Sequence, residues 1–228
     1  MPETTKDIQY NYMFEESYER KKLGRVATAR WNRDPETLLF SLSRYKFVSR
    51  VLRGRMRVLE IGCGDGWSSR IVAKSVNSLI LTDYDRKFVD EARGEYIDGI
   101  SQIDNNIECK VHDFVTDSYP EKQDGIFALD VLEHIDVADE DAFLRNITES
   151  LEVGGICIFG TPTKVSQTLI SEARRDPGHI NCKDEVSMRA SLEKYFGGVH
   201  IHTMTDEIVH TGSSDMAYYV FGIGVKVG

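Results

Sequence analysis

Acidic residues recur along the middle of the chain, each at or directly after a short apolar run. The segment VLEIGCGDG (58–66) contains Glu60 and three glycines, and later apolar runs lead to Asp83, Asp113 and Asp130. A carboxylate can accept hydrogen bonds from two ribose hydroxyl groups or from the exocyclic amine of a base. Acids at successive strand ends therefore indicate a site for a ligand that contains adenosine.

The glycines of VLEIGCGDG form the most distinctive of these segments. Glycine adopts positive φ easily and lets a ligand approach the backbone closely. A dinucleotide-binding turn places a small residue three positions after Gly64, where this chain has Trp67. The bulky indole and the nearby Glu60 disfavour a pyrophosphate. They favour a ligand that ends in a cationic amino acid and carries no phosphate.

Short apolar segments alternate with helical patterns through this region. Strands are expected at 57–62, 78–83, 107–113, 125–130 and 155–160, and helices at 67–76, 86–97 and 138–151. This alternation predicts an α/β fold of the doubly wound, Rossmann-like kind, with a mostly parallel sheet covered on both faces. In such sheets ligands bind beyond the carboxyl ends of the strands, which is where the acids lie.

The two ends of the chain follow other patterns. Asp34 and Pro35 are typical of a helix start, and apolar residues at helical spacing predict a helix over 36–52. Near the other end, a helix at 184–196 precedes the apolar segments 199–210 and 216–227. The link between those segments is too short for a crossover helix, so they predict a C-terminal antiparallel hairpin in a seven-stranded sheet.

These elements suggest two parts. An N-terminal arm with cap helices is expected over 1–54, and the main domain over 55–228, with an irregular insertion at about 161–183. The strand AYYVFGIGVKV (217–227) is interpreted either as an edge used in a homodimer or as a strand buried in the sheet.

Composition and charge exclude several partners. The formal net charge of −9 argues against nucleic acid as the main substrate, because phosphate binding needs a basic face. The apolar runs are far shorter than the roughly 20 residues that cross a bilayer. With no secretory signal and no zinc-type spacing among the four cysteines, we expect a cytoplasmic protein without membrane insertion.

Taken together, the motifs VLEIGCGDG, LTDYD, HDF, ALDVLEHI and LEVGGICIFGTP resemble the class I S-adenosylmethionine-dependent methyltransferases over about residues 55–160. The resemblance implies S-adenosyl-L-methionine as cofactor, S-adenosyl-L-homocysteine as product, and a small-molecule acceptor. The chain is similar in type to the ubiquinone- and polysaccharide-modifying enzymes. By position the resemblance assigns the methionine part to Glu60, Gly62, Cys63 and Gly64, the ribose to Asp83 and Tyr84, adenine to Asp113 and Phe114, and the sulfonium surroundings to Asp130 and Val131.

Two histidines are the candidate catalytic residues. His134 follows the fourth strand in ALDVLEHI, and His179 lies in the irregular segment as part of DPGHINC. A hydroxyl acceptor with a high pKa needs a general base such as histidine. The Asp-Asn pair that metal-dependent catechol enzymes carry after the fifth strand is absent, since Thr161 and Pro162 stand there. We therefore expect no metal.

Three interpretations of the acceptor stay open. The first is a sugar, sugar nucleotide or related anionic metabolite, methylated on oxygen, with Arg30, Arg33 and Trp31 of the N-terminal arm closing over it. His210, at a strand end, is a further candidate for binding the substrate. The second is a lipid-like or aromatic metabolite, methylated on oxygen or nitrogen under a lid that includes Phe40 and Tyr45. The third, from another class, is a scaffold that binds the cofactor without transferring the methyl group.

Overall fold

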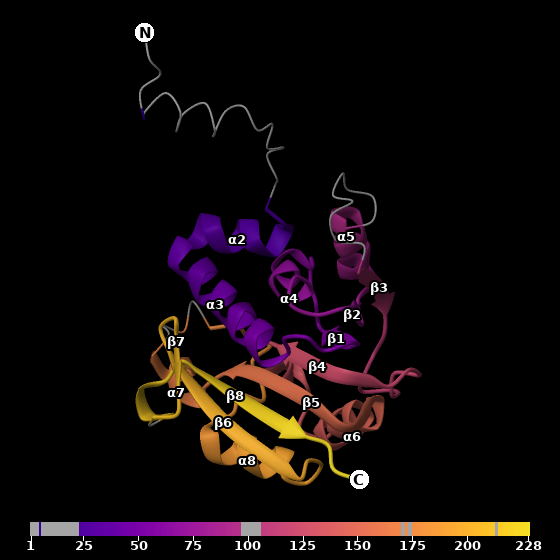
Figure 1. The fold of residues 1–228 in the computed structure, drawn as a ribbon. Coiled ribbons are helices and arrows are strands. Elements are labelled where there is room, and N and C mark those ends of the chain that lie inside the picture. The colour runs from indigo at the N-terminus through magenta and orange to yellow at the C-terminus, as the bar shows by residue number, and fades with distance from the viewer. Residues whose placement is uncertain (1–4, 6–22, 97–105, 170–171, 173–174, 213) are drawn as a thin grey trace.

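The strands of the described residues form an eight-stranded sheet at the centre of the molecule (Figure 1). The computed structural model describes residues 5, 23–96, 106–169, 172, 175–212 and 214–228. The strands are β1 (Val58–Ile61), β2 (Leu79–Asp83), β3 (Ile107–Val111), β4 (Gln123–Leu129), β5 (Leu151–Pro162), β6 (Gly198–Thr205), β7 (Ile208–His210) and β8 (Tyr219–Val225). Their order across the sheet is β3-β2-β1-β4-β5-β8-β6-β7.

Helices and short 3-10 turns connect and flank these strands. The α-helices with defined bounds are α2 (Arg25–Arg33), α3 (Pro35–Val51), α4 (Arg70–Ala73), α5 (Arg86–Tyr96), α6 (Glu140–Ser150), α7 (Lys164–Leu169) and α8 (Glu185–Leu192). The 3-10 turns are η1 (Trp67–Ser69), η2 (Leu132–His134) and η4 (Ser214–Met216).

Five neighbouring strands run parallel to one another, in the order β3, β2, β1, β4 and β5. From β1 the chain proceeds outward through β2 to β3, and it then returns to the other side of β1 to form β4. The strand order therefore reverses between β1 and β4, and a crevice opens at the carboxyl ends of these two strands. This arrangement confirms the doubly wound, mostly parallel sheet that the sequence predicts.

The C-terminal part of the sheet is antiparallel, as predicted, but it contains one strand more than expected. Strand β8 pairs with β5 on one side and with β6 on the other. The segment 199–210 is two strands rather than one, because the chain turns at Asp206, which has a φ of 55°, and β7 folds back onto β6. Since both edges of β8 are paired, the interpretation of this strand as a dimer edge is wrong.

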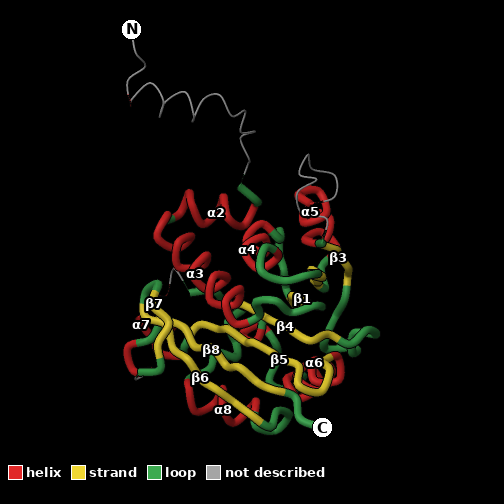
Figure 2. Tube along the Cα trace, in the orientation of Figure 1, coloured by secondary structure: helices red, strands yellow, loops and turns green. Residues whose placement is uncertain are grey.

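Helices cover both faces of the sheet (Figure 2). Alternate residues of a strand point to opposite faces, so Val58 of β1 packs in one hydrophobic cluster and Leu59 in the other. The first cluster includes residues of α3, α4 and α5, and the second includes residues of α6 and α8. Val48 of α3 is fully buried in the first cluster, so this helix shares its core with the sheet. The boundary at residue 54 stays a prediction.

Local sequence explains where several helices begin. The Asp34 side chain accepts a hydrogen bond from the backbone of Glu36, and Pro35 occupies the first turn of α3. Helix α8 begins with a capping box formed by Asp184 and Ser187. The segment predicted as a helix over 67–76 is shorter, and the short helix α7 lies in the part predicted to be irregular. Of the first 24 residues of the predicted N-terminal arm, only residues 5, 23 and 24 are described.

The described helices include none that is both long enough and apolar enough to span a membrane. All four cysteines are free thiols, and three of them are buried.

Candidate cofactor and acceptor site

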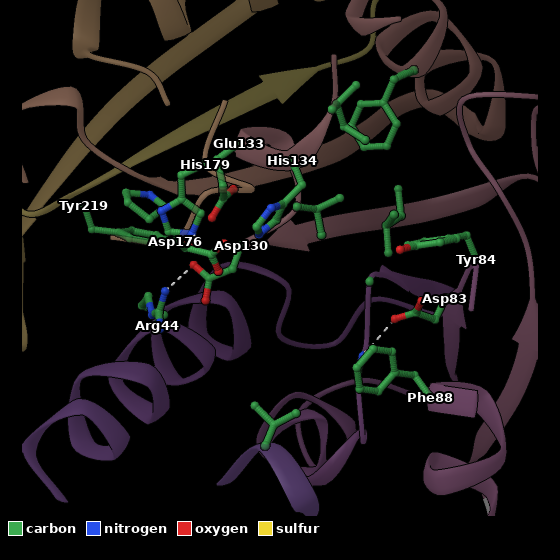
Figure 3. A pocket seen from close by; sticks show the side chains of 18 of the residues that line it. Arg44, Asp83, Tyr84, Phe88, Asp130, Glu133, His134, Asp176, His179 and Tyr219 are labelled. Atoms are coloured by element: carbon green, nitrogen blue, oxygen red, sulfur yellow. Dashed lines mark hydrogen bonds and ion pairs between the residues drawn. The ribbon is translucent and has the colours of Figure 1, made fainter. Parts of the chain in front are cut away.

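A cavity of about 1180 Å³ opens at the carboxyl ends of the parallel strands, beside the crevice between β1 and β4 (Figure 3). Single ligands commonly occupy pockets of roughly 300–1,000 Å³, so this cavity is large for a single-ligand pocket. Figure 3 shows Asp83, Tyr84 and Phe88 at one end and Asp130, Glu133, His134 and His179 at the other. We call these the β2 end and the β4 end.

The glycine turn after β1 lines the cavity between its two ends. Gly62 and Gly64 have φ angles of 71° and 55°, in the left-handed region that favours glycine. A Cβ atom on Gly62 would lie only 2.4 Å from Cγ2 of Val131, which follows β4. The two loops thus touch at the point where the strand order reverses, and a side chain on Gly62 would force them apart.

Asp83 is held in place by the backbone around it. Its Oδ2 accepts a hydrogen bond from the Gly64 N–H at 3.1 Å, and its Oδ1 accepts one from the Asp85 N–H at 3.0 Å. Burial raises the pKa of this carboxyl, while the two backbone hydrogen bonds act in the opposite direction. Tyr84 and Phe88 also line the cavity at this end. The β2 end therefore presents a fixed carboxylate beside two aromatic rings.

Asp113 and Phe114 line the cavity where the chain leaves β3. Oδ1 of Asp113 accepts a hydrogen bond from the Val115 N–H at 2.9 Å. Phe114 is buried, and its ring centroid lies 4.5 Å from that of His112 in an edge-on arrangement. The structure therefore brings the predicted ribose and adenine residues to the same cavity.

Two residues assigned to the methionine part lie outside the lining of the cavity. Glu60 is buried on β1, and its Oε1 accepts a hydrogen bond from the Tyr45 hydroxyl at 2.8 Å. Cys63 is buried in the hydrophobic cluster shared by α3, α4 and α5. Cys63 lies between Gly62 and Gly64, but its side chain packs in the core instead of facing the cavity. Glu60 lies on the face of β1 that packs against α3, as its hydrogen bond with Tyr45 shows.

Two residues assigned to the acceptor also lie elsewhere. The side chain of Trp31 is on the outer face of α2 and is 52% exposed. His210 lies on β7, where its ring is hydrogen-bonded to the hydroxyl groups of Thr203 and Thr205 at 3.1 and 3.0 Å. Neither residue lines the cavity, so the geometry gives no support to these two assignments. Arg30, the third, does line it.

At the β4 end, Asp130 is part of a partly buried charge network. Its backbone has a φ of 56°, and its carboxylate forms ion pairs with Arg44 of α3 and, at 3.3 Å, with Arg30 of α2. The Arg44 guanidinium lies between two rings, 5.1 Å from the centroid of Phe40 and 4.6 Å from that of Tyr219. Burial alone would raise the pKa of Asp130, but the charges of the two arginines hold it below its usual range.

Glu133, His134 and His179 form a second cluster at this end. Their possible ligand atoms all lie within 4.8 Å of one another. Glu133 is fully buried, and neither of its carboxylate oxygens has a hydrogen-bond partner among the described residues. Burial and the neighbouring Asp130 carboxylate raise the pKa of Glu133. Burial and the neighbouring His134 lower the pKa of His179.

Comparison with known proteins identifies the family. Residues 58–155 match the sequence profile of a family described as a methyltransferase domain. The ubiquinone biosynthesis O-methyltransferase of Xanthomonas campestris pv. campestris strain B100 is 29% identical over 147 residues, which cover 63% of this chain and 60% of that protein. The chain carries a class I S-adenosylmethionine-dependent methyltransferase domain.

Solved structures of other methyltransferases share the fold of this domain. The methyltransferase domain of bacterial CtHen1 superposes with a TM-score of 0.67 at 18% identity, covering 83% of this chain and 100% of that one. Magnesium protoporphyrin IX methyltransferase from Synechocystis PCC 6803, solved with bound S-adenosylhomocysteine, gives a TM-score of 0.62 at 18% identity. That match covers 98% of this chain and 95% of the other.

The residues of this methyltransferase domain fit S-adenosylmethionine. The turn at Gly62 and Gly64 leaves the backbone accessible from the cavity, and Asp83 presents a fixed acceptor for hydroxyl groups. Among the described lining residues, the two arginines, Arg30 and Arg44, both pair with Asp130, so their charge is already compensated within the protein. The lining therefore suits a ligand without phosphates.

Sequence reasoning missed several of the residues at this cavity. Phe40, which the sequence suggests as part of an acceptor lid, lines the cavity. Arg44 lies four positions later on the same face of α3, but nothing in the helical pattern distinguishes it from a core-packing residue. Tyr219 lies on β8, far away in sequence from the motifs. Glu133 stands within the motif ALDVLEHI, and only the structure shows that its carboxylate is buried without a partner among the described residues.

Proposed function

We propose that this methyltransferase transfers a methyl group from S-adenosylmethionine to a hydroxyl oxygen of a small, uncharged molecule with an apolar body. The single observation that carries this proposal is the continuity of one cavity between Asp83 at the β2 end and the two histidines at the β4 end. A cofactor held at the first end and an acceptor at the second would meet near Asp130 and Val131.

The cofactor supplies an activated methyl group on a sulfonium, so catalysis depends mainly on positioning the acceptor and excluding water. Among the protein side chains, Asp83 would bind the ribose hydroxyl groups. Asp113 and Phe114 would bind the adenine. Gly62 and Gly64 would allow the methionine part to approach the backbone. The burial of Phe114 supports its role as a fixed surface for the base.

The two histidines can raise the nucleophilicity of an acceptor hydroxyl. Nδ1 of His134 faces the carbonyl oxygen of Gly178 at 2.9 Å, and a carbonyl only accepts hydrogen bonds, so Nδ1 carries the proton. Nδ1 of His179 lies 3.2 Å from Oε1 of Gln167 and donates in the same way. The lone pair is then on Nε2 in each ring. Either Nε2 can take the proton of the hydroxyl as oxygen attacks the methyl carbon.

The charge of the cavity favours an uncharged acceptor over an anionic one. Among the described residues, the lining includes five carboxyl side chains and two guanidinium groups, and both guanidinium groups pair with Asp130. A phosphate or carboxylate on the acceptor would therefore meet an excess of negative charge. Phe40, Leu169 and Tyr218 supply apolar surface to the same cavity. The name of the Xanthomonas relative, an O-methyltransferase, agrees with oxygen as the methylated atom.

A transfer assay with methyl-labelled S-adenosylmethionine tests the proposal. The panel should contain uncharged phenols and catechols, neutral sugars, sugar nucleotides and primary amines, each with the wild-type protein and with Asp83→Ala. We expect label on the hydroxylated aromatic compounds with the wild type only. Transfer only to sugar nucleotides or amines would contradict the proposed acceptor. Cofactor binding without any transfer across a broad panel would favour the non-catalytic scaffold.

A further inference from the structure

The carboxylate of Glu133 is buried at the β4 end in an environment that does not satisfy it. Its side chain is fully buried, and no described residue donates a hydrogen bond to either oxygen. The nearby guanidinium of Arg44 pairs with Asp130 instead. A buried carboxylate without a partner is strongly unfavourable, so this position favours either a proton or a bound cation.

The two imidazole rings beside Glu133 are oriented as ligands. Each Nδ1 faces an oxygen acceptor, Gly178 O for His134 and Gln167 Oε1 for His179, which leaves each Nε2 with its lone pair. Their ring centroids lie 5.0 Å apart. Hydrogen bonds from the second ring nitrogen commonly orient histidines that bind metals.

Backbone hydrogen bonds hold the two segments of this cluster together. The carbonyl oxygen of Glu133 accepts from the N–H groups of Ile180 and Asn181, both at 2.9 Å. Gly178 permits this close approach, because a Cβ atom there would lie 2.9 Å from Nδ1 of His134. The loop that contains His179 is therefore fastened to the 3-10 turn that contains Glu133 and His134.

We propose that Glu133, His134 and His179 bind one divalent transition-metal cation and that this cation holds the acceptor oxygen. The role of the cation in holding the acceptor rests on the proposed function. Ligands of one such cation stand at most about 4 Å apart, so the cluster needs to contract by less than about 1 Å. Two imidazoles and one carboxylate suit Mn²⁺, Co²⁺, Fe²⁺ or Zn²⁺ better than Mg²⁺, which prefers oxygen ligands. This inference departs from the sequence-based expectation of no metal.

Three protein ligands leave coordination positions for the acceptor. Asp176 lines the same cavity, and its Oδ2 lies 3.9 Å from Nε2 of His179, so it can provide a further oxygen. A hydroxyl group bound to such a cation has a lowered pKa and loses its proton to solvent water. The oxygen then forms a bond to the methyl carbon while the carbon–sulfur bond breaks and its electron pair stays on sulfur. In this arrangement the histidines bind the cation instead of accepting the proton.

Titration of the metal-free protein with Co²⁺ or Mn²⁺ alone tests the site without any methyl transfer. We expect one cation per chain by calorimetry and, with Co²⁺, visible absorption bands of a site with nitrogen ligands. Glu133→Gln and His179→Asn should each weaken binding by at least about tenfold. The matched control is His200→Asn, because His200 is exposed on β6 away from the cavity; it should bind like the wild type.

A second variant covers the case in which a buried substitution prevents folding. His134 is exposed, so His134→Asn removes a ligand without opening the core, and circular dichroism checks that each protein is folded. Absence of binding by the wild type, or binding by His134→Asn as tight as that of the wild type, would overturn the metal site. S-adenosylmethionine titrations in chelator separate the two proposals. If the protein binds the cofactor and transfers the methyl group without binding a metal, only the metal site is contradicted. If it binds the metal but transfers no methyl group, only the proposed function is contradicted.

Discussion

The carboxylate of Asp130 forms an ion pair with the guanidinium of Arg44, which joins the end of β4 to helix α3 inside the protein. The Arg44 side chain is only 7% exposed and lies between the rings of Phe40 and Tyr219. Removing Arg44 would leave the partly buried Asp130 carboxylate with Arg30 alone among the described residues, and loss of compensation for such a charge destabilises the fold. The ion pair therefore holds helix α3 beside the cavity and also holds the Asp130 side chain in its position.

Replacing Arg44 tests this role. Arg44→Met keeps most of the side-chain volume but leaves Asp130 with Arg30 as its only cationic partner among the described residues. We expect the free energy of unfolding to fall by about 3 kcal/mol. The control is Arg30→Met, which should cost less than about 1 kcal/mol because Arg30 is partly exposed. Urea denaturation measures both, and equal losses would contradict the proposed difference between the two arginines.

Asp83→Asn tests the assignment of the ribose. The substitution keeps the shape of the side chain and removes its charge, so hydrogen bonds from the ribose hydroxyl groups weaken. We expect the affinity for S-adenosylmethionine to fall by about tenfold or more in calorimetry. Asp90→Asn, on the exposed side of α5, is the control and should leave the affinity unchanged. Wild-type affinity in Asp83→Asn would reject the assignment.

Gly62→Ala should destabilise the protein for two separable reasons. The positive φ costs about 1–2 kcal/mol for a residue with a Cβ atom, and the overlap with Val131 adds about 1–3 kcal/mol. Gly54→Ala isolates the first cost, because Gly54 has a φ of 78° and a Cβ atom there would meet no other atom within 4 Å. Thermal denaturation should rank Gly62→Ala well below Gly54→Ala. The double variant Gly62→Ala with Val131→Ala should recover part of the difference.

Glu60 should make stability depend on pH. Burial raises its pKa from 4.5 to about 7, although the Tyr45 hydrogen bond lowers it in part. Because the folded state binds this proton more tightly than the unfolded state, the stability is full below the unfolded pKa and is lost as pH rises through about 7. Relative to Glu60→Gln, the wild type should lose about 2–3 kcal/mol between about pH 5 and about pH 8. An unchanged difference in urea denaturation at the two pH values would contradict the raised pKa.

The sequence predicts the sheet and the cofactor end well because both depend on local patterns. Apolar strands, the glycine turn and the acids at strand ends are each visible within a few residues, and Gly62, Asp83 and Asp113 all line the cavity. The predictions that were wrong concern residues whose positions depend on contacts with segments distant in the sequence. The outward position of Trp31 depends on how α2 packs, and the division of 199–210 into β6 and β7 depends on one turn at Asp206.

The β4 end was the least predictable part for the same reason. The pairing of Arg44 with Asp130 joins residues 86 positions apart, and the contact between His134 and Gly178 joins residues 44 positions apart. A helical spacing predicts that Arg44 lies on the same face as Phe40, but it does not identify the charge that faces them. The burial of the Glu133 carboxylate away from any described donor is likewise a property of packing, not of spacing.

The placement of β8 has a consequence for how the protein acquires its activity. This strand is synthesised after β5 and β6, yet it lies between them and brings Tyr219 to the wall of the cavity. A nascent chain that already contains every glycine and acid of the cofactor motifs still has an open gap in its sheet. Ligand recognition at the β4 end therefore awaits the late insertion of this strand, and until then the unpaired edge of β5 is exposed to other chains.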